Sequence, residues 1–282
     1  MTIHDLINKD GVSVDTTSQS CITALIDADS IIYIIGWNHR DVDNPETVAA
    51  AVDRFINDIL IKTQARQYAG FFSDRKCFRN DIYDDYKANR REIDPGIEKW
   101  KPYIQEYCIE MWKFEKLAKL EADDAVAELQ RSMVNSVICS PDKDLKQVSG
   151  NNYNYSKDVH VHIDEDEAMY NWATQMICGD STDNIKGLPR AGKVAAKKLL
   201  DPLRGSSAEV YNQAVTDAYY NKFGNLDEYH LHCRLIGVGM ENLDAALPYI
   251  NTFDLESAVP SEYISTNSEN VGQDAEDLFG SW

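Results

Sequence analysis

The sequence has no apolar run long enough to cross a lipid bilayer, so no transmembrane segment is expected. Its first twenty residues carry three aspartates and lack the basic start and apolar centre of a secretory signal peptide. The six cysteines are scattered and form no Cys-x-x-Cys pair, a distribution typical of reduced thiols. These absences together predict a cytoplasmic protein.

Basic residues are scarce relative to acidic ones. The chain has 28 lysines and arginines against 47 aspartates and glutamates, which gives a formal net charge of −19. Such a charge should repel nucleic acids at long range. That argument weakens if many of the acids bind divalent cations, because bound cations change the sign of the local field. The positions of the acids along the chain therefore decide which interpretation holds.

Segments typical of strands alternate with segments typical of helices. Asn44-Pro45 is a helix-start signal, with Asn as the cap and Pro at the first helical position. The alternation predicts an α/β fold with a mainly parallel sheet flanked by helices, followed by a smaller helical part. The expected strands are 22–26, 68–73, 107–111, 136–140, 153–155 and 159–163. The first is followed by a loop and an apolar continuation up to residue 35. The expected helices are 45–67, 122–134, 165–177 and most of 194–250.

Composition divides the chain further. Residues 75–101 are charged and aromatic without a clean period, and we expect an exposed excursion there. Residues 255–282 contain no basic residue and are expected to be disordered. The expected organisation is a leader at 1–20, a core at 21–175, a helical part at 176–254 and an acidic tail at 255–282.

Three of the expected strands end in aspartates. Asp27 follows ITALI, Asp74 follows YAGFFS, and Asp142 and Asp144 follow SVICS. The carboxyl ends of parallel strands share one edge of an open sheet, where ligands bind. Carboxylates that are far apart in the sequence are therefore predicted to converge at this edge.

Five further acids extend the set to nine. They are Glu121, Asp123 and Asp124, which open the 122–134 helix with Glu121 expected ahead of its first turn, and Asp180 and Asp183, which follow the 165–177 helix. Nine acids at one edge would repel one another, so a counter-charge is required. A pair of Mg²⁺ ions, which Mn²⁺ can replace, suits carboxylate oxygens. Two such ions about 4 Å apart fit the hydrolysis of a phosphodiester.

A basic stretch follows directly after the last two acids. Five cations and no acid lie from Lys186 to Lys198, across a turn that contains Gly187, Pro189 and Gly192. Groups able to hold a metal are thus joined to groups able to hold a phosphate. This junction indicates a phosphodiester placed against metal ions.

A haloacid-dehalogenase phosphatase would use some of the same residues, with Asp27 as the nucleophile and Asp29 as the general acid. Such an enzyme needs a strand before its late Gly-Asp-Ser motif, which would be 179–181 here. The preceding apolar residues, among them Trp172 and Met176, are instead spaced as a helix face. The phosphatase would also leave most of the nine acids without a role, so we favour phosphodiester hydrolysis.

Six short motifs occur in a specific order and spacing: Leu25-Ile-Asp27, Phe72-Ser-Asp74, Tyr86-Lys-Ala-Asn-Arg90, Glu121-Ala-Asp-Asp124, Ser140-Pro-Asp-Lys-Asp-Leu145 and Gly179-Asp-Ser-Thr-Asp-Asn184, which runs into Gly187-Leu-Pro-Arg-Ala-Gly-Lys193. Together they resemble the flap endonuclease and 5′→3′ exonuclease family, and within it the stand-alone exonucleases of short-tailed bacteriophages. The resemblance covers about residues 22–200. It implies a PIN-like nuclease core, a helical arch or clamp around 75–101, and a C-terminal helix–three-turn–helix that binds DNA.

The resemblance also implies roles for the nine acids. Asp27, Asp74 and Asp123 are similar to the ligands around a first metal, with Glu121 as an outer-sphere partner. Asp142, Asp144 and Asp180 are similar to the group around a second metal, with Asp124 and Asp183 in support.

Tyr86, Lys87 and Arg90 fall in the arch that this family places over its active site. The resemblance implies that Lys87 and Arg90 are catalytic and contact the scissile phosphate, for which Arg offers a fork and Lys a point charge. Tyr86 can stack on a base of the DNA. Without the resemblance, a solvated loop with ordinary surface bases would be the simpler interpretation.

Residues 187–198 resemble the helix–three-turn–helix, in which glycines let the backbone approach DNA, sometimes through a bound K⁺. The residues implied in DNA contact are Gly187, Arg190, Gly192, Lys193 and Lys197. The family pattern Gly-x-x-Gly-Ile-Gly is not kept, because Arg190-Ala191 replaces Gly-Ile. Arg190 can add a phosphate contact, whereas the departure weakens the case for K⁺.

The implied activity is a metal-dependent 5′→3′ exonuclease or flap endonuclease in phage DNA replication or recombination, located in the host cytoplasm. Its substrates would be double-stranded DNA with 5′ ends or flaps, and RNA in RNA–DNA hybrids as a further class. The end of the acidic tail, 277–282, is either a docking peptide for a replication protein or inert. A non-catalytic DNA-binding relative is the alternative, which nine converging acids disfavour.

Two histidine pairs invite a zinc interpretation. His160 with His162, and His230 with His232 and Cys233, match no ligand set of recognised spacing. On a strand, His160 and His162 would share one face, as solvated positions also do. We interpret these residues as surface positions.

Overall fold

The computed structural model describes residues 21–90, 94–239 and 251–252. The predicted leader at 1–20 and acidic tail at 255–282 lie outside the described residues, as does the 240–250 portion of the predicted helical part. Within these described ranges, no helix is both long and apolar enough to cross a membrane.

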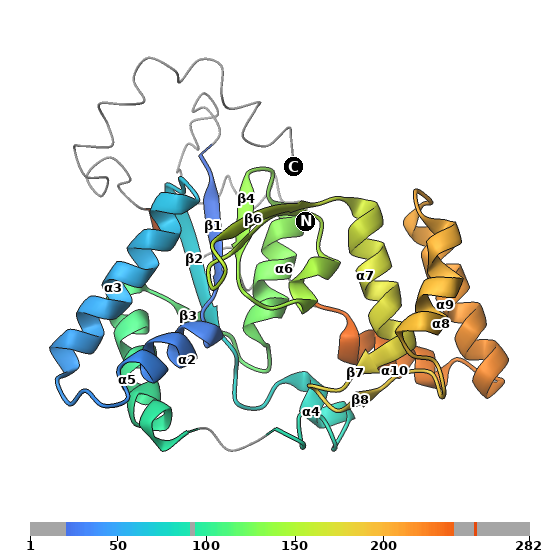
Figure 1. Ribbon diagram of the computed structural model, residues 1–282, viewed down its shortest axis with the longest axis horizontal. Coiled ribbons are helices and arrows are strands. Elements are labelled where there is room, and N and C mark those ends of the chain that lie inside the picture. Colours follow the sequence, from blue (N-terminus) through green and yellow to red (C-terminus); the bar gives the residue numbers. More distant parts are fainter. Residues whose placement is uncertain (1–20, 91–93, 240–250, 253–282) are drawn as a thin grey trace, which may run out of the picture.

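A central sheet contains β1 (Thr23–Asp27), β2 (Gln67–Phe72), β3 (Glu115–Lys116), β4 (Ser136–Cys139), β5 (Gly150–Asn154), β6 (Val159–Ile163) and β9 (Asn251–Thr252). The strand order is β3-β2-β1-β4-β5-β6, with β9 on β2 (Figure 1). Pairing is parallel from β3 to β5, whereas β6 and β9 run antiparallel to their neighbours. The predicted α/β fold with a mainly parallel sheet is confirmed. The predicted strand pair is also there, with β6 at 159–163 as predicted and β5 at 150–154 rather than 153–155.

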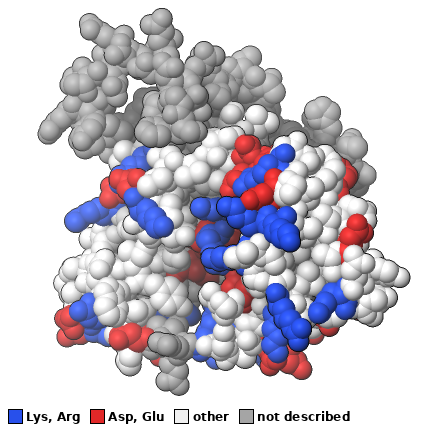
Figure 2. Space-filling model, turned by 45° about the vertical axis from the view of Figure 1, so that its right-hand side comes forward, with Lys and Arg blue, Asp and Glu red and all other residues white. Residues whose placement is uncertain are grey.

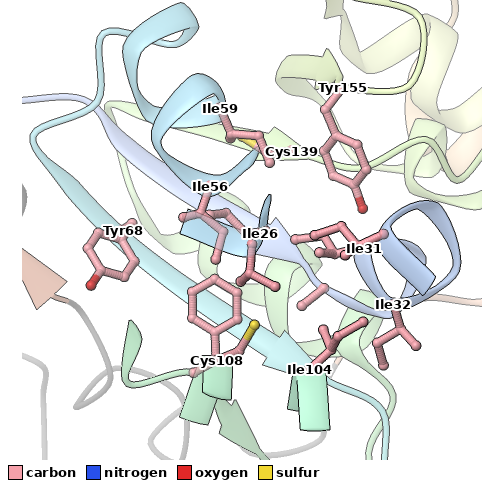
Figure 3. Close-up of a cluster of buried hydrophobic side chains, with 14 of the residues drawn as sticks. Ile26, Ile31, Ile32, Ile56, Ile59, Tyr68, Ile104, Cys108, Cys139 and Tyr155 are labelled. Carbon is pink, nitrogen blue, oxygen red and sulfur yellow. The ribbon is translucent and has the colours of Figure 1, made fainter. Parts of the chain in front are cut away.

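Four helices cover the sheet: α2 (Asp29–Asn38), α3 (Pro45–Lys62), α5 (Pro95–Trp112) and α6 (Ala122–Ser132). The side chains of β1 can pack against helices on both faces of the sheet, because successive side chains of a strand point to opposite faces. Ala24 and Ile26 belong to the cluster beneath α2, α3 and α5, which Figure 3 shows around Ile26, while Leu25 packs with α6. Strand β1 is buried throughout, as expected for a strand with helices on both sides.

A second group of helices lies beside the sheet (Figure 1): α7 (Glu165–Cys178), α8 (Lys193–Leu200), α9 (Ala208–Phe223) and α10 (Asp227–Ile236). These helices bury a core of their own, in which Tyr211, Val215 and Tyr219 of α9 are fully buried. Helix α7 also contacts η1 (Asp144–Gln147), the short turn that follows β4. The predicted division at 175/176 stays a prediction, and it falls inside α7.

Helix α3 begins where the sequence predicts but ends earlier. Asn44 is the cap, since its Oδ1 accepts a hydrogen bond from the Glu46 backbone N–H at 2.9 Å. The helix ends at Lys62 rather than at 67, because the chain turns at Gln64, which has φ of 53°. This turn leads directly into β2.

The predicted strand at 107–111 is wrong, because these residues belong to α5. Asp94 caps this helix, with its Oδ1 accepting from the Gly96 N–H at 2.8 Å, and Pro95 takes the first position. Residues 97, 100, 104 and 108 face the core with a spacing of three or four, which is the period of a helix. The apolar continuation after Asp27 is likewise a helix, α2.

Candidate metal centre

The carboxyl ends of β1, β2 and β4 meet at one edge of the sheet, as predicted. Asp27 closes β1, and its Oδ2 accepts a hydrogen bond from Ser140 Oγ, just after β4, at 2.7 Å. Asp29 accepts from the backbone N–H of Ser73, just after β2, at 3.2 Å. Side chains separated by more than a hundred residues are therefore linked at the strand ends.

Helix α6 brings three more predicted acids to this edge. Glu121 is its N-cap and thus precedes the first turn, as expected. Glu121, Asp123 and Asp124 each offer a carboxylate oxygen within 4.8 Å of the others. Such a set of hard oxygen donors suits Mg²⁺ or Mn²⁺.

Arg79, in α4 (Phe78–Ile82), is part of the centre and was missed by the sequence analysis. It is only 1% exposed, and its guanidinium holds both oxygens of Asp124 at 2.7 Å and Glu121 Oε2 at 3.0 Å. It also donates to the carbonyls of Leu235 and Gly237, next to α10. Both oxygens of Asp124 are thus engaged by Arg79. The partners lie too far away along the chain for any local signal to reveal them.

The predicted exposed excursion at 75–101 is wrong for part of its length, because Tyr86 is only 4% exposed. Its hydroxyl donates to Glu121 at 2.6 Å and to Asp183 at 3.2 Å. Lys87 pairs with Glu121 and lies 3.7 Å from Asp183, and Arg90 pairs with Asp183 at 2.8 Å. The three residues of the predicted arch therefore contact the acid cluster. Stacking of Tyr86 on a base stays a prediction and requires the ring to leave this position.

Asp180 lies in β7 (Gly179–Asp180), which pairs with β8 (Ile185–Lys186) and follows α7. Lys143 bridges it to η1, with Nζ 2.5 Å from Asp180 Oδ2 and 2.7 Å from Asp144 Oδ1. Since a helix precedes Asp180, the strand that a haloacid-dehalogenase phosphatase requires is not there.

Four of the acids line one small cavity, of about 10 Å³ or the size of roughly one water-sized sphere. They are Asp123, Asp144, Asp180 and Asp183, with Arg79 and Tyr86 also in the wall. Figure 2 shows lysines and arginines gathered around a hollow in the surface, with acidic side chains inside it. The carboxylates inside the hollow suit metal ions, and the basic side chains around it would attract an anionic ligand toward those ions.

Burial opposes ionisation of several of these carboxyl groups. It raises the pKa of Asp27 to about 7, with the charge of Asp29 as the second cause. It also raises the pKa of Asp123, helped by Asp124, and that of Asp144, helped by Asp142. A raised pKa means that the negatively charged form of a buried carboxylate is disfavoured. A bound divalent cation would stabilise that form, so these residues fit such an ion.

Neighbouring cations reverse this effect at two other acids. Burial favours the neutral form of Glu121, but the charges of Lys87 and Arg79 hold its pKa below the usual value. At Asp180, the hydrogen bond and charge of Lys143 likewise outweigh burial and lower the pKa. The protein thus supplies its own cations to part of the cluster.

We expect the metal-free protein to lose stability as the pH rises from about 4 to about 7. A carboxyl group whose pKa is raised by folding binds more protons in the folded state, so its contribution is full below the unfolded pKa and lost above the folded one. Thermal unfolding in EDTA at pH 5 and pH 7.5 should give the lower midpoint at pH 7.5.

The variant Asp27→Asn is the control for this pH dependence, since it should reduce the difference between the two midpoints. It separates the carboxyl effect from that of His232, whose pKa is lowered by burial and which acts in the opposite direction. The parent protein and Asp27→Asn could instead both show a midpoint of thermal unfolding at pH 7.5 that equals or exceeds the one at pH 5. That result would contradict the assignment of the pH dependence to the raised pKa of Asp27.

Three predicted acids lie at the strand ends but outside the cavity wall: Asp27, described above, and Asp74 and Asp142. Asp74 accepts from the backbone N–H of Lys119 at 2.9 Å, a bond that lowers its pKa. Asp142 is exposed, and its Oδ1 accepts from the Asp144 N–H at 2.8 Å. Their role as metal ligands stays a prediction.

The predicted DNA-binding turn lies between β8 and α8. Lys193 and Lys197 of α8 are exposed, as is Gly192, its N-cap. Gly187 is packed against the backbone of residues 177–179, where an added Cβ would lie 2.2 Å from Cys178 C, so close packing explains this glycine. Arg190 has φ of 67° and is exposed. The contacts of these residues with DNA, and a K⁺ ion there, stay predictions.

The predicted surface histidines differ in their surroundings. His160 and His162 lie on β6, where His162 is hydrogen-bonded to Asn151, while His232 is buried and bonded to Tyr219 at 2.6 Å. His232 is therefore a core residue rather than a surface one. Across the described residues, the α6 acids form a group close enough to hold a metal ion, and no set of histidines does.

The family model for the 5′-3′ exonuclease, N-terminal resolvase-like domain, matches residues 23–173. Flap endonuclease Xni of Shewanella woodyi is 29% identical over 147 residues, covering 48% of this chain and 58% of that protein. DNA polymerase I of Rhizobium leguminosarum is 33% identical over 148 residues, covering 45% of this chain and 14% of the polymerase. The chain thus spans little more than half of the first relative and a small part of the second.

Solved structures show the same fold. The zinc-bound 5′-exonuclease of bacteriophage T5 superimposes with a TM-score of 0.56 at 18% identity, covering 80% of this chain and 97% of that one. The T5 flap endonuclease in a pseudo-enzyme–product complex with DNA and metal ions gives a TM-score of 0.56 at 14% identity, covering 86% and 95%. At these identities the likeness concerns the fold alone.

Proposed function

The chain belongs to the family of the 5′-3′ exonuclease N-terminal resolvase-like domain, and from this premise we propose that it is a divalent-metal-dependent 5′→3′ exonuclease with flap endonuclease character. The observation that carries the proposal is the convergence of Asp123, Asp144, Asp180 and Asp183 on one cavity. Beside it, Lys87 and Arg90 of the predicted arch pair with Glu121 and Asp183. The relatives, named as a flap endonuclease and as DNA polymerase I, support it.

The nine acids divide into two groups in this proposal. Asp27, Asp74 and Asp123 would hold a first Mg²⁺, and Asp142, Asp144 and Asp180 a second, with Glu121 and Asp183 positioned by the arch and Asp124 by Arg79. When bound, two Mg²⁺ ions, which Mn²⁺ can replace, would polarise the phosphodiester and lower the pKa of the attacking water.

The arch cations would hold the scissile phosphate. Lys87 and Arg90 lie over Glu121 and Asp183, so a phosphate that approaches the metal ions meets two positive side chains. Arg90 is about half exposed and is available to an incoming DNA end. Their charges would stabilise the negative charge that develops on the phosphate oxygens.

The exposed turn and α8 would hold the DNA away from the cut, through Arg190, Lys193 and Lys197. The proposed substrates are double-stranded DNA with 5′ ends or flaps, and RNA–DNA hybrids as a second class, in phage replication in the host cytoplasm. A replication partner for the acidic tail and a K⁺ ion at the turn belong to the same proposal.

The deciding experiment uses duplex, flap and RNA–DNA hybrid substrates labelled at the 5′ or the 3′ end, incubated with Mg²⁺ or with EDTA. We expect release of 5′-terminal products in Mg²⁺ and none in EDTA. Binding of the same substrates without Mg²⁺-dependent cleavage of any of them would identify a non-catalytic DNA-binding relative instead.

Replacement of Lys87 by alanine should slow the single-turnover rate on a flap substrate by roughly 100-fold, because a charge aimed at the reacting phosphate is lost. The Kd for the same substrate should change much less. Lys76→Ala is the matched control, since Lys76 is exposed in the same predicted arch and has no ion pair within the described residues. A rise in Kd as large as the fall in rate would make Lys87 a positioning contact only.

A further inference from the structure

Lys143 occupies an unusual position between two of the predicted ligands of the second metal. Its Nζ lies 2.7 Å from Asp144 Oδ1 and 2.5 Å from Asp180 Oδ2, so one amine bridges acids from η1 and from β7. Both acids line the cavity of the metal centre. The amine therefore occupies oxygens that the proposed function assigns to a divalent ion.

Lys143 is far more exposed to solvent than Arg79, the buried cation of the same cluster. Its side chain is 61% exposed while those of Asp144 and Asp180 are 19% and 8% exposed, so the amine reaches inward from the solvent. The side chain of Arg79, by contrast, is only 2% exposed and is fixed by two carboxylates and two backbone carbonyls. Lys143 can leave its partners for water without unfolding any element.

The chemistry of lysine agrees with a displaceable role. An ammonium is a compact, strongly hydrated charge on a flexible stem, so this amine can exchange its carboxylate partners for water. A divalent cation that binds the same oxygens brings twice the charge and binds to several carboxylates at once.

We propose that Lys143 is a resident, displaceable counter-ion of Asp144 and Asp180, which balances their charge in the metal-free protein and competes with the divalent ion for the same oxygens. The inference rests on the proposed function, since it concerns the second metal of that site. It makes Lys143 a determinant of metal affinity rather than a catalytic residue.

The variant Lys143→Met should bind divalent ions more tightly and should be less stable without them. Divalent binding at the weaker site should become about three- to tenfold tighter, because the amine no longer competes for the same oxygens. The metal-free protein should unfold at a lower temperature, because Asp144 and Asp180 lose their shared cation. A lysine with a purely structural role would give the second effect without the first.

The experiment measures Mn²⁺ binding to the full chain by electron paramagnetic resonance of free Mn²⁺, and thermal unfolding in EDTA. Lys146→Met is the matched control, since Lys146 is exposed on the same short turn, and the part of the chain that the structure describes shows no ion pair for it. We expect near-parent Mn²⁺ affinity for Lys146→Met and for the charge-conserving Lys143→Arg.

Three results would overturn the inference. Mn²⁺ binding by Lys143→Met that equals or falls below that of the parent would do so, with the proposed function intact. Equal tightening in Lys143→Met and Lys146→Met would assign the effect to net charge alone. A parent protein that binds no Mn²⁺ would overturn both the inference and the metal-dependent function.

Discussion

Replacement of Arg79 by methionine should lower the free energy of unfolding by about 3–5 kcal/mol, the range for breaking one side of a buried ion pair. Asp124 is fully buried and would lose its bidentate partner, and the Leu235 and Gly237 carbonyls would lose their donor. Urea unfolding in EDTA, with the midpoint and slope fitted together, measures the change.

Two comparisons define the origin of this loss. Lys62→Met removes an exposed pair with Asp158 and should change the free energy by less than about 1 kcal/mol. Arg79→Met combined with Asp124→Leu removes both buried charges and should recover much of the stability, since well-packed apolar residues often replace a buried pair without loss. An Arg79→Met variant no less stable than Lys62→Met would show that the pair contributes nothing net.

The Arg79 contacts show how the helical part can be joined to the metal centre. Its guanidinium contacts the first turn of α6 on one side and the end of α10 on the other. Helix α6 carries Glu121 and Asp123, and α10 belongs to the helices that pack around α7. One side chain from the predicted arch therefore fixes the position of the acids relative to the helices beyond the sheet.

The sequence predicted those parts of the site that local patterns determine. Strand ends were found because an apolar run stops at an acid, as at Asp27, and parallel pairing then places those ends together. The helix start at Asn44 was found because the capping group lies within three residues of its partner. Both signals are contained in a few neighbouring residues.

The features that the sequence did not reveal depend on distant partners. Tyr86 and Arg79 are polar residues in a segment without a period, and their hydrogen-bond partners lie far along the chain, at positions 121, 124, 183, 235 and 237. Helix α5 was mistaken in part for a strand because its aromatic residues favour strands locally, while packing against α2 and α3 decides the outcome. Tertiary contacts therefore account for these errors.

Replacement of Asp144 by asparagine should lower the rate of cleavage by about 1,000-fold. The proposed function makes Asp144 a metal ligand, whose loss would remove several kcal/mol of stabilisation from the reacting phosphate. DNA binding should persist, because the exposed cations to which the proposed function assigns DNA contact, Arg90, Lys193 and Lys197, are unchanged. Single-turnover cleavage of a labelled flap and titration of the same flap in Ca²⁺ separate the two quantities.

The same variant should make the metal-free protein more stable at pH 7.5, which excludes misfolding as the cause of the lost cleavage. Burial and Asp142 raise the pKa of Asp144, so its charged form is disfavoured in the folded state and an uncharged isostere relieves that cost. Asp217→Asn is the control, since Asp217 is exposed on α9 and should alter neither quantity. Cleavage by Asp144→Asn at the parent rate would show that the acids of the centre have been misassigned. A thermal midpoint in EDTA below that of the parent protein would show that Asp144 stabilises the fold rather than opposing it.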